Sequence, residues 1–179
     1  WREAVQGYQL FSDLYAQLGP HEQQVLDRSA GNGYWVAFRT GYLLETNLQS
    51  AAEAEGQFTL AFTDARDSRQ PFMWRLAALL GDFLYRHERF LDAEMYFGLA
   101  RLARERHPSA SEPASEMTFR IIQSLWKGGK ERDARVEYAR MAQKWGDTTN
   151  QSDRAFLDKA TTFMQSVKGV TDTQNRRSD

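Results

Sequence analysis

Histidine is the side chain best suited to acid–base and metal chemistry, and the chain has three, His21, His87 and His107. None lies three or four residues from another, and none belongs to an HExxH pattern, so no two of them can share a metal ion on one helical face. Asp92 and Glu94 form a carboxylate pair in sequence, but residues two apart on a helix do not face each other. These residues predict neither a metal site nor an acid–base centre.

The sequence also lacks a phosphate-binding loop and the motif that would activate a nucleophilic side chain. The glycines at 31–33 and 128–129 lack the lysine, the serine and the strand that a phosphate loop requires. Ser115, Ser124 and Ser166 lack the G-x-S-x-G setting of hydrolases, and the chain contains no cysteine. We therefore expect a protein that is not an enzyme and that binds no cofactor and no metal.

Six arginines near one another in the sequence could hold an acidic partner: Arg101, Arg104, Arg106, Arg132, Arg135 and Arg140. The alternative, which we favour, is a solvated helix face whose charge is balanced by Glu105, Glu131, Asp133 and Glu137. The tryptophans and tyrosines also have two interpretations. Most lie on predicted core stripes, although binding hot spots favour the same residue types.

Composition excludes further classes of function. With 23 Lys and Arg against 24 Asp and Glu, the net charge is −1, which gives no bulk attraction to nucleic acid or to a membrane surface. No apolar run approaches the roughly 18–20 residues of a spanning helix. We expect no nucleic-acid partner, no membrane span and a cytoplasmic location. The chain begins with Trp1 rather than Met, which predicts a fragment or a processed product.

The elements that position any binding residue are predicted to be helices, because the chain has only four prolines and is dominated by segments containing Ala, Leu, Glu and Arg. Residues 74–108 organise this all-α chain. Two apolar stripes at helical spacing are joined there by the polar turn 86–89. Gly81 lies within the first stripe, where glycine costs about 1 kcal/mol of helix propensity relative to alanine, so we expect another backbone to come close to it.

This stretch resembles a tetratricopeptide repeat. The residues that carry the resemblance are Ala77-x2-Leu80-Gly81-x2-Leu84, Phe90, Ala93-x3-Phe97-x2-Ala100 and Pro108. Ala77 stands where the family usually has Trp, Leu84 stands where it has Tyr, and Pro108 comes about three residues late. The resemblance implies antiparallel helix hairpins that stack into a short right-handed superhelix.

The second-helix pattern recurs at Ala54-x3-Phe58-x2-Ala61 and at Ala134-x3-Tyr138-x2-Met141. The leading alanines are 39 residues apart from 54 to 93 and 41 apart from 93 to 134, which fits a repeat of about 34 residues with insertions or a looser array of about 40. We expect a repeat domain at 32–168. Its predicted parts are hairpins at 33–66, 71–107 and 113–146 and a C-terminal capping helix at 152–167.

The ends of the chain are less regular. Residues 1–31 are predicted to form an N-terminal helical segment, with a helix at 1–18 and a shorter one at 21–29. Helix caps are expected at Ser111 or Ser115 and at Ser152-Asp153. The capping helix is expected to turn Asp158 and Lys159 away from its apolar face, and residues 169–179 to form a mobile tail.

In the family, the first helices of successive repeats line a concave groove. The resemblance therefore implies that a partner binds Arg75, Asp82, Tyr85, Arg86, Phe119, Gln123, Trp126 and Lys127. Trp35, Phe38 and Tyr42 could join them. The family members that clamp a C-terminal carboxylate use Lys, Asn and Arg in the groove. Asp82, Leu79 and Gln123 stand at the corresponding places here, so we do not predict that ligand.

Two functions remain open from the sequence. The first is a non-catalytic interaction module that binds a peptide or helix of a protein partner in the groove. The second is a structural subunit, or a fragment of a larger repeat assembly, that packs on further repeats or associates with itself. A helical hairpin cut at residue 1 leaves an open face, which favours the second.

Overall fold

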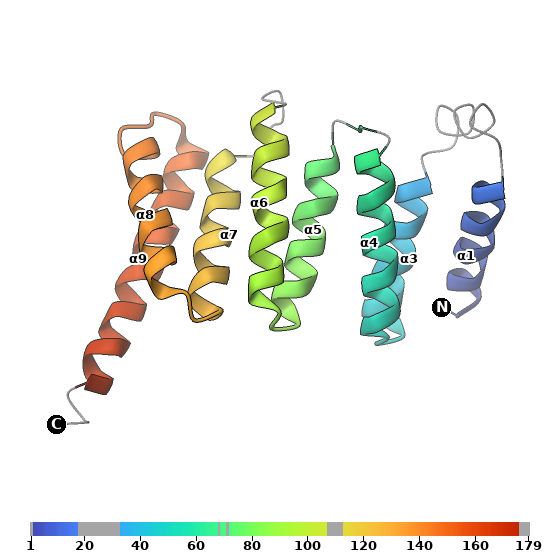
Figure 1. Ribbon diagram of the computed structural model, residues 1–179, viewed down its shortest axis with the longest axis horizontal. Helices are drawn as coiled ribbons and strands as arrows, with labels where there is room; N and C mark the ends of the chain where they lie inside the picture. The colour runs from blue at the N-terminus through green and yellow to red at the C-terminus, as the bar shows by residue number, and fades with distance from the viewer. Residues whose placement is uncertain (1, 18–32, 68, 71, 107–112, 176–179) are drawn as a thin grey trace. The chain divides into compact units, whose positions relative to one another are not determined.

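The computed structural model describes residues 2–17, 33–67, 69–70, 72–106 and 113–175, and every regular element within these ranges is an α-helix (Figure 1). The all-α prediction is confirmed. The predicted helix at 21–29 and Pro71 lie outside the described residues. The helices are α1 (Arg2–Gln17), α3 (Gly33–Asn47), α4 (Ala51–Asp67), α5 (Met73–Arg86), α6 (Phe90–Arg106), α7 (Ala114–Lys127), α8 (Glu131–Trp145) and α9 (Gln151–Asn175).

Contacts divide the chain into two compact units, Trp1–Phe83 and Leu84–Asp179, and the division falls inside α5. The repeat domain expected at 32–168 includes parts of both units and stays a prediction. Each unit has buried apolar residues of its own.

In the first unit, a glycine allows α3 and α4 to approach closely. A Cβ atom on Gly41 would lie 3.0 Å from the ring of Phe58 and 3.1 Å from the carbonyl oxygen of Ala54. The ring of Phe58 also contacts that of Phe83, with 5.2 Å between their centroids. The helix α1 lies against α3 and buries Val5. The core of this unit is therefore built around the α3–α4 hairpin.

In the second unit, α7 contacts α6, α8 and α9. Ile121 and Ile122 of α7 are buried, as are Phe97 of α6 and Met141 of α8. The buried residues of α7 also include Met117 and Leu125 and three small polar residues, Ser115, Thr118 and Ser124. The unit is thus organised around α7.

Polar contacts attach α9 to this core. The Oδ1 atom of Asp153 accepts hydrogen bonds from the backbone N–H of Ser115 (3.2 Å) and from its hydroxyl (2.6 Å). The hydroxyl groups of Tyr138 and Thr161 lie 3.0 Å apart. One contact joins α9 to α7 and the other joins it to α8, so the register of the last helix is held at two points.

The turns within the hairpins share one geometry. Gln49, Glu88 and Gly129 all have positive φ angles, of 53°, 60° and 78°. In each turn the next residue accepts, through its carbonyl oxygen, a hydrogen bond from an alanine four residues further on. These bonds run from Ala54 to Ser50 (2.9 Å), from Ala93 to Arg89 (2.9 Å) and from Ala134 to Lys130 (3.0 Å). The three alanines are completely buried, so each turn fixes the start of a second helix against its neighbours.

Two predicted caps are wrong, and the reason is the same for both. Pro113 occupies the N-cap position of α7, because Ser115 is buried inside the helix and bonded to Asp153. At α9, the Oδ1 atom of Asn150 accepts the N–H groups of Ser152 and Asp153 (2.9 Å and 3.2 Å). A tertiary contact takes the polar side chain that the sequence pattern assigned to a local cap. Ser111 lies outside the described residues, and α9 runs to Asn175, beyond the predicted end at 167.

Candidate functional site

A cavity of about 460 Å³ lies between α7 and α9 in the second unit. Two predicted site residues of α7 line it, and α9 supplies the rest of the wall. The lining residues are Phe119, Gln123, Ala155, Asp158, Lys159, Thr162, Phe163 and Ser166. Positions three and four apart share one side of a helix, which brings each set to the same wall. The cavity is the place where the structure gathers predicted site residues.

Aromatic contacts shape the apolar part of this cavity. The ring centroid of Phe119 lies 6.3 Å from those of Phe156 and Phe163. Trp126 meets Phe163 edge-on at 6.4 Å, and the guanidinium carbon of Arg135 lies 5.3 Å from the centroid of the Trp126 ring. Trp126 therefore supports the cavity through a ring that lines it.

The polar part of the cavity is mixed in charge. The Oε1 atom of Gln123 is buried, and among the described residues it finds no hydrogen-bond donor. The ammonium group of Lys159 lies 4.4 Å from the centroid of the Phe156 ring. The carboxylate of Asp158 lies 3.5 Å from the guanidinium of Arg154. The cavity thus combines an apolar wall with an amide, a cation and an anion.

Tyr85 is half-buried on α5, with its ring 5.2 Å from that of Phe90 in an edge-on arrangement. Burial raises the pKa of the Tyr85 phenol, and the positive charge of Arg120 partly opposes this rise. Arg120 belongs to α7. Arg120 was not among the predicted site residues.

The remaining predicted site residues are placed as follows. Arg86 and Lys127 are exposed in the second unit. Arg75 and Asp82 belong to the first unit, where Arg75 is exposed with its guanidinium carbon 5.3 Å from the centroid of the Trp74 ring, and Asp82 is half-buried. The structure therefore brings Phe119, Gln123 and Trp126 together. That all eight residues line one shared groove stays a prediction.

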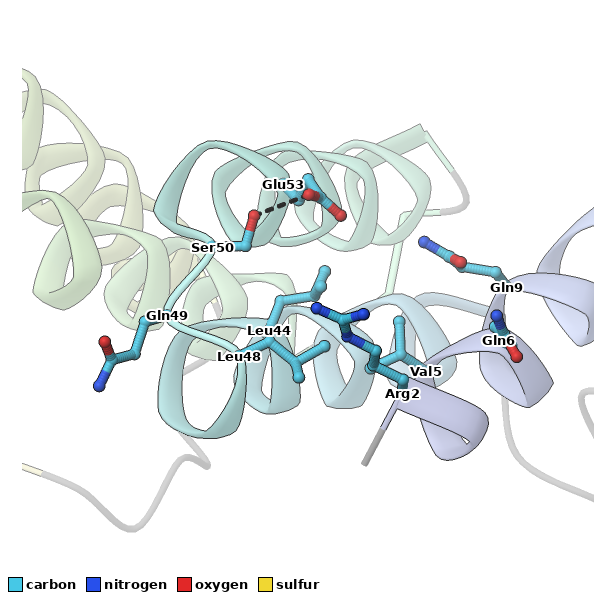
Figure 2. Close-up of a pocket in the computed structure, with 9 residues that line it drawn as sticks. All are labelled: Arg2, Val5, Gln6, Gln9, Leu44, Leu48, Gln49, Ser50 and Glu53. Carbon is cyan, nitrogen blue, oxygen red and sulfur yellow. Dashed lines mark hydrogen bonds between the residues drawn. The ribbon is translucent and has the colours of Figure 1, made fainter.

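A second cavity, of about 480 Å³, lies in the first unit between α1 and the α3–α4 turn. Figure 2 shows two of the lining residues, Leu44 and Leu48, opposite Val5 and Arg2 of α1. The hydroxyl of Ser50 donates a 2.8 Å hydrogen bond to Glu53 at its rim. None of the eight predicted site residues lines this cavity, so it stands apart from the site implied by the sequence.

The sequence did not predict the α9 residues that line the cavity between α7 and α9. Asp158, Lys159, Thr162 and Ser166 are exposed polar residues, and Asp158 and Lys159 were assigned to the solvent side of the helix. They are exposed, yet they form a wall because α9 lies beside α7. The expected repeat architecture could have indicated these residues, because a capping helix packs where the first helix of a further repeat would lie.

Charge pairing accounts for much of the arginine cluster. Arg101 and Arg140 both pair with Glu137, at 3.0 Å and 2.8 Å, and Arg135 lies 3.8 Å from Glu131. Arg104 is buried and donates a hydrogen bond to the carbonyl oxygen of Pro113 (2.9 Å). The ion pairs of Arg101, Arg135 and Arg140 match the predicted charge-balanced face, whereas Arg104 is buried and does not belong to a solvated face.

Within the described part of the chain, no group of three or more His, Asp or Glu side chains is arranged to hold a metal ion. In the same residues, none of the helices combines the length and the apolar character that crossing a bilayer requires. No protein-family model matches the sequence, and a search of curated proteins finds no match.

Proposed function

We propose that the chain is a non-catalytic, tetratricopeptide-like scaffold that binds a peptide or helix of a protein partner in the cavity between α7 and α9. The cavity is the observation that supports this proposal. It is lined by Phe119 and Gln123, which the sequence predicted to face a ligand, and by residues of α9, which the sequence did not predict as site residues. Ligand sites combine an apolar lining with a few polar groups that fix orientation.

The repeated turns support the architectural half of the proposal. Three hairpin turns with the same backbone conformation recur 39 and 41 residues apart, from Gln49 to Glu88 and from Glu88 to Gly129. Each precedes a buried alanine by five residues. An array of equivalent hairpins is what a helical repeat protein requires.

The composition of the cavity indicates the kind of segment that would fit. Phe119 and Phe163 suit one apolar side chain of the ligand, while Asp158 and Lys159 can meet charged groups of either sign on it. Gln123 can donate and accept hydrogen bonds. An amphipathic segment with one apolar anchor and charged side chains near it matches this surface.

The test is to fill the cavity without removing its walls. Thr162→Trp places a large ring into the cavity from an exposed position, and Gln165→Trp adds the same ring to α9 at an exposed residue that does not line it. Both variants and the wild type are immobilised, and bound proteins from the source organism are quantified by mass spectrometry. A synthetic peptide from any captured protein is then titrated against all three.

We expect a partner that binds the wild type and Gln165→Trp but loses about tenfold or more in affinity to Thr162→Trp, as the loss of a buried anchor implies. Equal binding by all three proteins would contradict a site in this cavity. Circular dichroism of each variant confirms that the helices are intact.

An exposed apolar stripe on α6, formed by Leu91, Met95, Leu99 and Leu102, favours the second candidate function, self-association. That surface lies on a different helix from the cavity, so the two functions are compatible.

A further inference from the structure

The cavity between α1 and the α3–α4 turn has the size of a small-molecule site. Its volume is about 480 Å³, and ligand pockets typically enclose about 300–1,000 Å³. The helix α1 contributes Arg2, Val5, Gln6 and Gln9, which share one face because residues three and four apart on a helix are neighbours. All of the lining residues belong to the first unit, so the walls are parts of one compact body.

The apolar part of this cavity is supplied by residues of the unit's core. The side chains of Val5 and Leu44 are buried, and Leu48 is half-buried. Figure 2 shows Val5 on α1 and both leucines across from it. Because core side chains are held by close packing on their other sides, they form a preformed apolar surface that can receive an aliphatic group of a ligand.

Two glutamine amides of α1 line the cavity and are not used within the chain. Among the described residues, the side chains of Gln6 and Gln9 make no hydrogen bond. Gln9 is half-buried, and Figure 2 shows its amide directed toward the α4 side of the cavity. An amide group has both donors and an acceptor, so it suits a ligand that carries polar groups of both kinds.

One cation and one anion reach the cavity from different helices. Glu53 belongs to α4, where its Oε1 atom accepts a 2.8 Å hydrogen bond from the hydroxyl of Ser50 and its Oε2 atom remains available. Arg2 belongs to α1. Within the described part of the chain, Arg2 and Glu53 form an ion pair neither with each other nor with another side chain. The cavity therefore offers a ligand two opposite charges that are not neutralised internally.

These groups disfavour several classes of ligand. A divalent cation requires several oxygen or nitrogen ligands, and Glu53 is the only carboxylate among the lining residues, opposed by the charge of Arg2. A phosphate group would meet that one guanidinium but would be repelled by Glu53. The lining residues include no aromatic ring on which a nucleobase could stack. A small ligand with one charge of each sign and an apolar side is complementary to the cavity.

We propose that this cavity binds a free amino acid with an aliphatic side chain. The carboxylate of the ligand pairs with Arg2, whose guanidinium matches the geometry of a carboxylate. Its ammonium group pairs with Glu53, its side chain lies on Leu44 and Leu48, and Gln9 supplies a further hydrogen bond. The site is separate from the cavity between α7 and α9, so this proposal does not depend on peptide binding there.

The experiment is equilibrium dialysis of the full chain against single compounds, each quantified by mass spectrometry. L-leucine and L-valine are expected to bind, and L-aspartate and L-lysine are expected to bind about tenfold or more weakly, because their second charge would lie on the apolar surface. Leucine amide lacks the carboxylate, and N-acetyl-leucine lacks the ammonium group. Both should also bind more weakly than leucine.

Substitutions in the protein identify the partner of each charge. Arg2→Gln should weaken the binding of leucine about tenfold or more but leave that of leucine amide unchanged, because the amide has no carboxylate to lose. Glu53→Gln should do the same for leucine and leave N-acetyl-leucine unchanged. Arg39→Gln and Glu3→Gln are the matched controls, at exposed residues of the same unit that do not line the cavity, and should not change binding.

A wild type that binds none of the aliphatic amino acids would overturn the proposal. So would an affinity for leucine that survives both Arg2→Gln and Glu53→Gln, or leucine amide and N-acetyl-leucine that bind as tightly as leucine itself. Circular dichroism of each variant separates a lost contact from lost helices. Since Thr162→Trp does not alter this cavity, it should bind leucine as the wild type does.

Discussion

The fold changes the ionisation of Tyr85, one of the predicted site residues. Burial raises the pKa of its phenol, and Arg120 lowers it by a smaller amount. The surrounding structure therefore disfavours the phenolate, even with a cation close by. At neutral pH the phenol stays protonated and can donate a hydrogen bond to a ligand.

In a titration followed by ultraviolet absorbance, the difference between wild type and Tyr85→Phe should show a phenol that ionises above the ordinary value of about 10. Arg120→Gln should move this pKa further up, because it removes the opposing charge. The unfolded chain releases the proton first as pH rises through about 10, so the stability contributed by Tyr85 is full below that pH and is lost as pH rises through the higher pKa of the folded state. An unshifted titration in the wild type would show that the phenol is not buried.

The sequence alone does not predict the backbone conformation of the turns. Gln49 and Glu88 adopt the left-handed region although neither is glycine, and only Gly129 is the residue that this conformation favours. The three turns are equivalent in structure but not in side chain. Substitutions that exchange the residue types should therefore act in opposite directions.

Gly129→Ala should lower the free energy of unfolding by about 1 kcal/mol, since a side chain is disfavoured at positive φ. Glu88→Gly should raise it by up to about 1 kcal/mol for the converse reason. Urea denaturation of both variants beside the wild type measures the two effects. Changes of the same sign would show that the turns do not share this geometry.

At the scale of the whole molecule, the contacts form two compact units, and this division has a consequence for local stability. Ile122 is completely buried in the second unit. Its truncation to alanine should cost about 2–5 kcal/mol. Hydrogen exchange should then speed up in α7, α8 and α9 more than in the α3–α4 hairpin. Uniform acceleration along the whole chain would contradict separate units.

Helix positions could be predicted well from the sequence, because apolar residues at helical spacing report directly on which face is buried. The ends of the helices were harder to place. Ser115 has the chemistry of a cap, but whether it caps or bonds Asp153 depends on a helix 38 residues away. Likewise, Phe119 and Gln123 could be named from the repeat pattern, whereas Lys159 and Thr162 could not. Their exposed positions carry no apolar signal, and they form a cavity wall only through the packing of α9.

The constant turn also determines where this chain can change its length. Five residues separate the left-handed position from the buried alanine in all three hairpins, so an insertion there would shift the second helix out of register. From each buried alanine to the left-handed residue of the next hairpin turn the chain takes 34 residues between Ala54 and Glu88 but 36 between Ala93 and Gly129. The extra length falls outside the turns. A change in chain length is therefore expected to be better tolerated outside the turns than between a left-handed residue and its buried alanine.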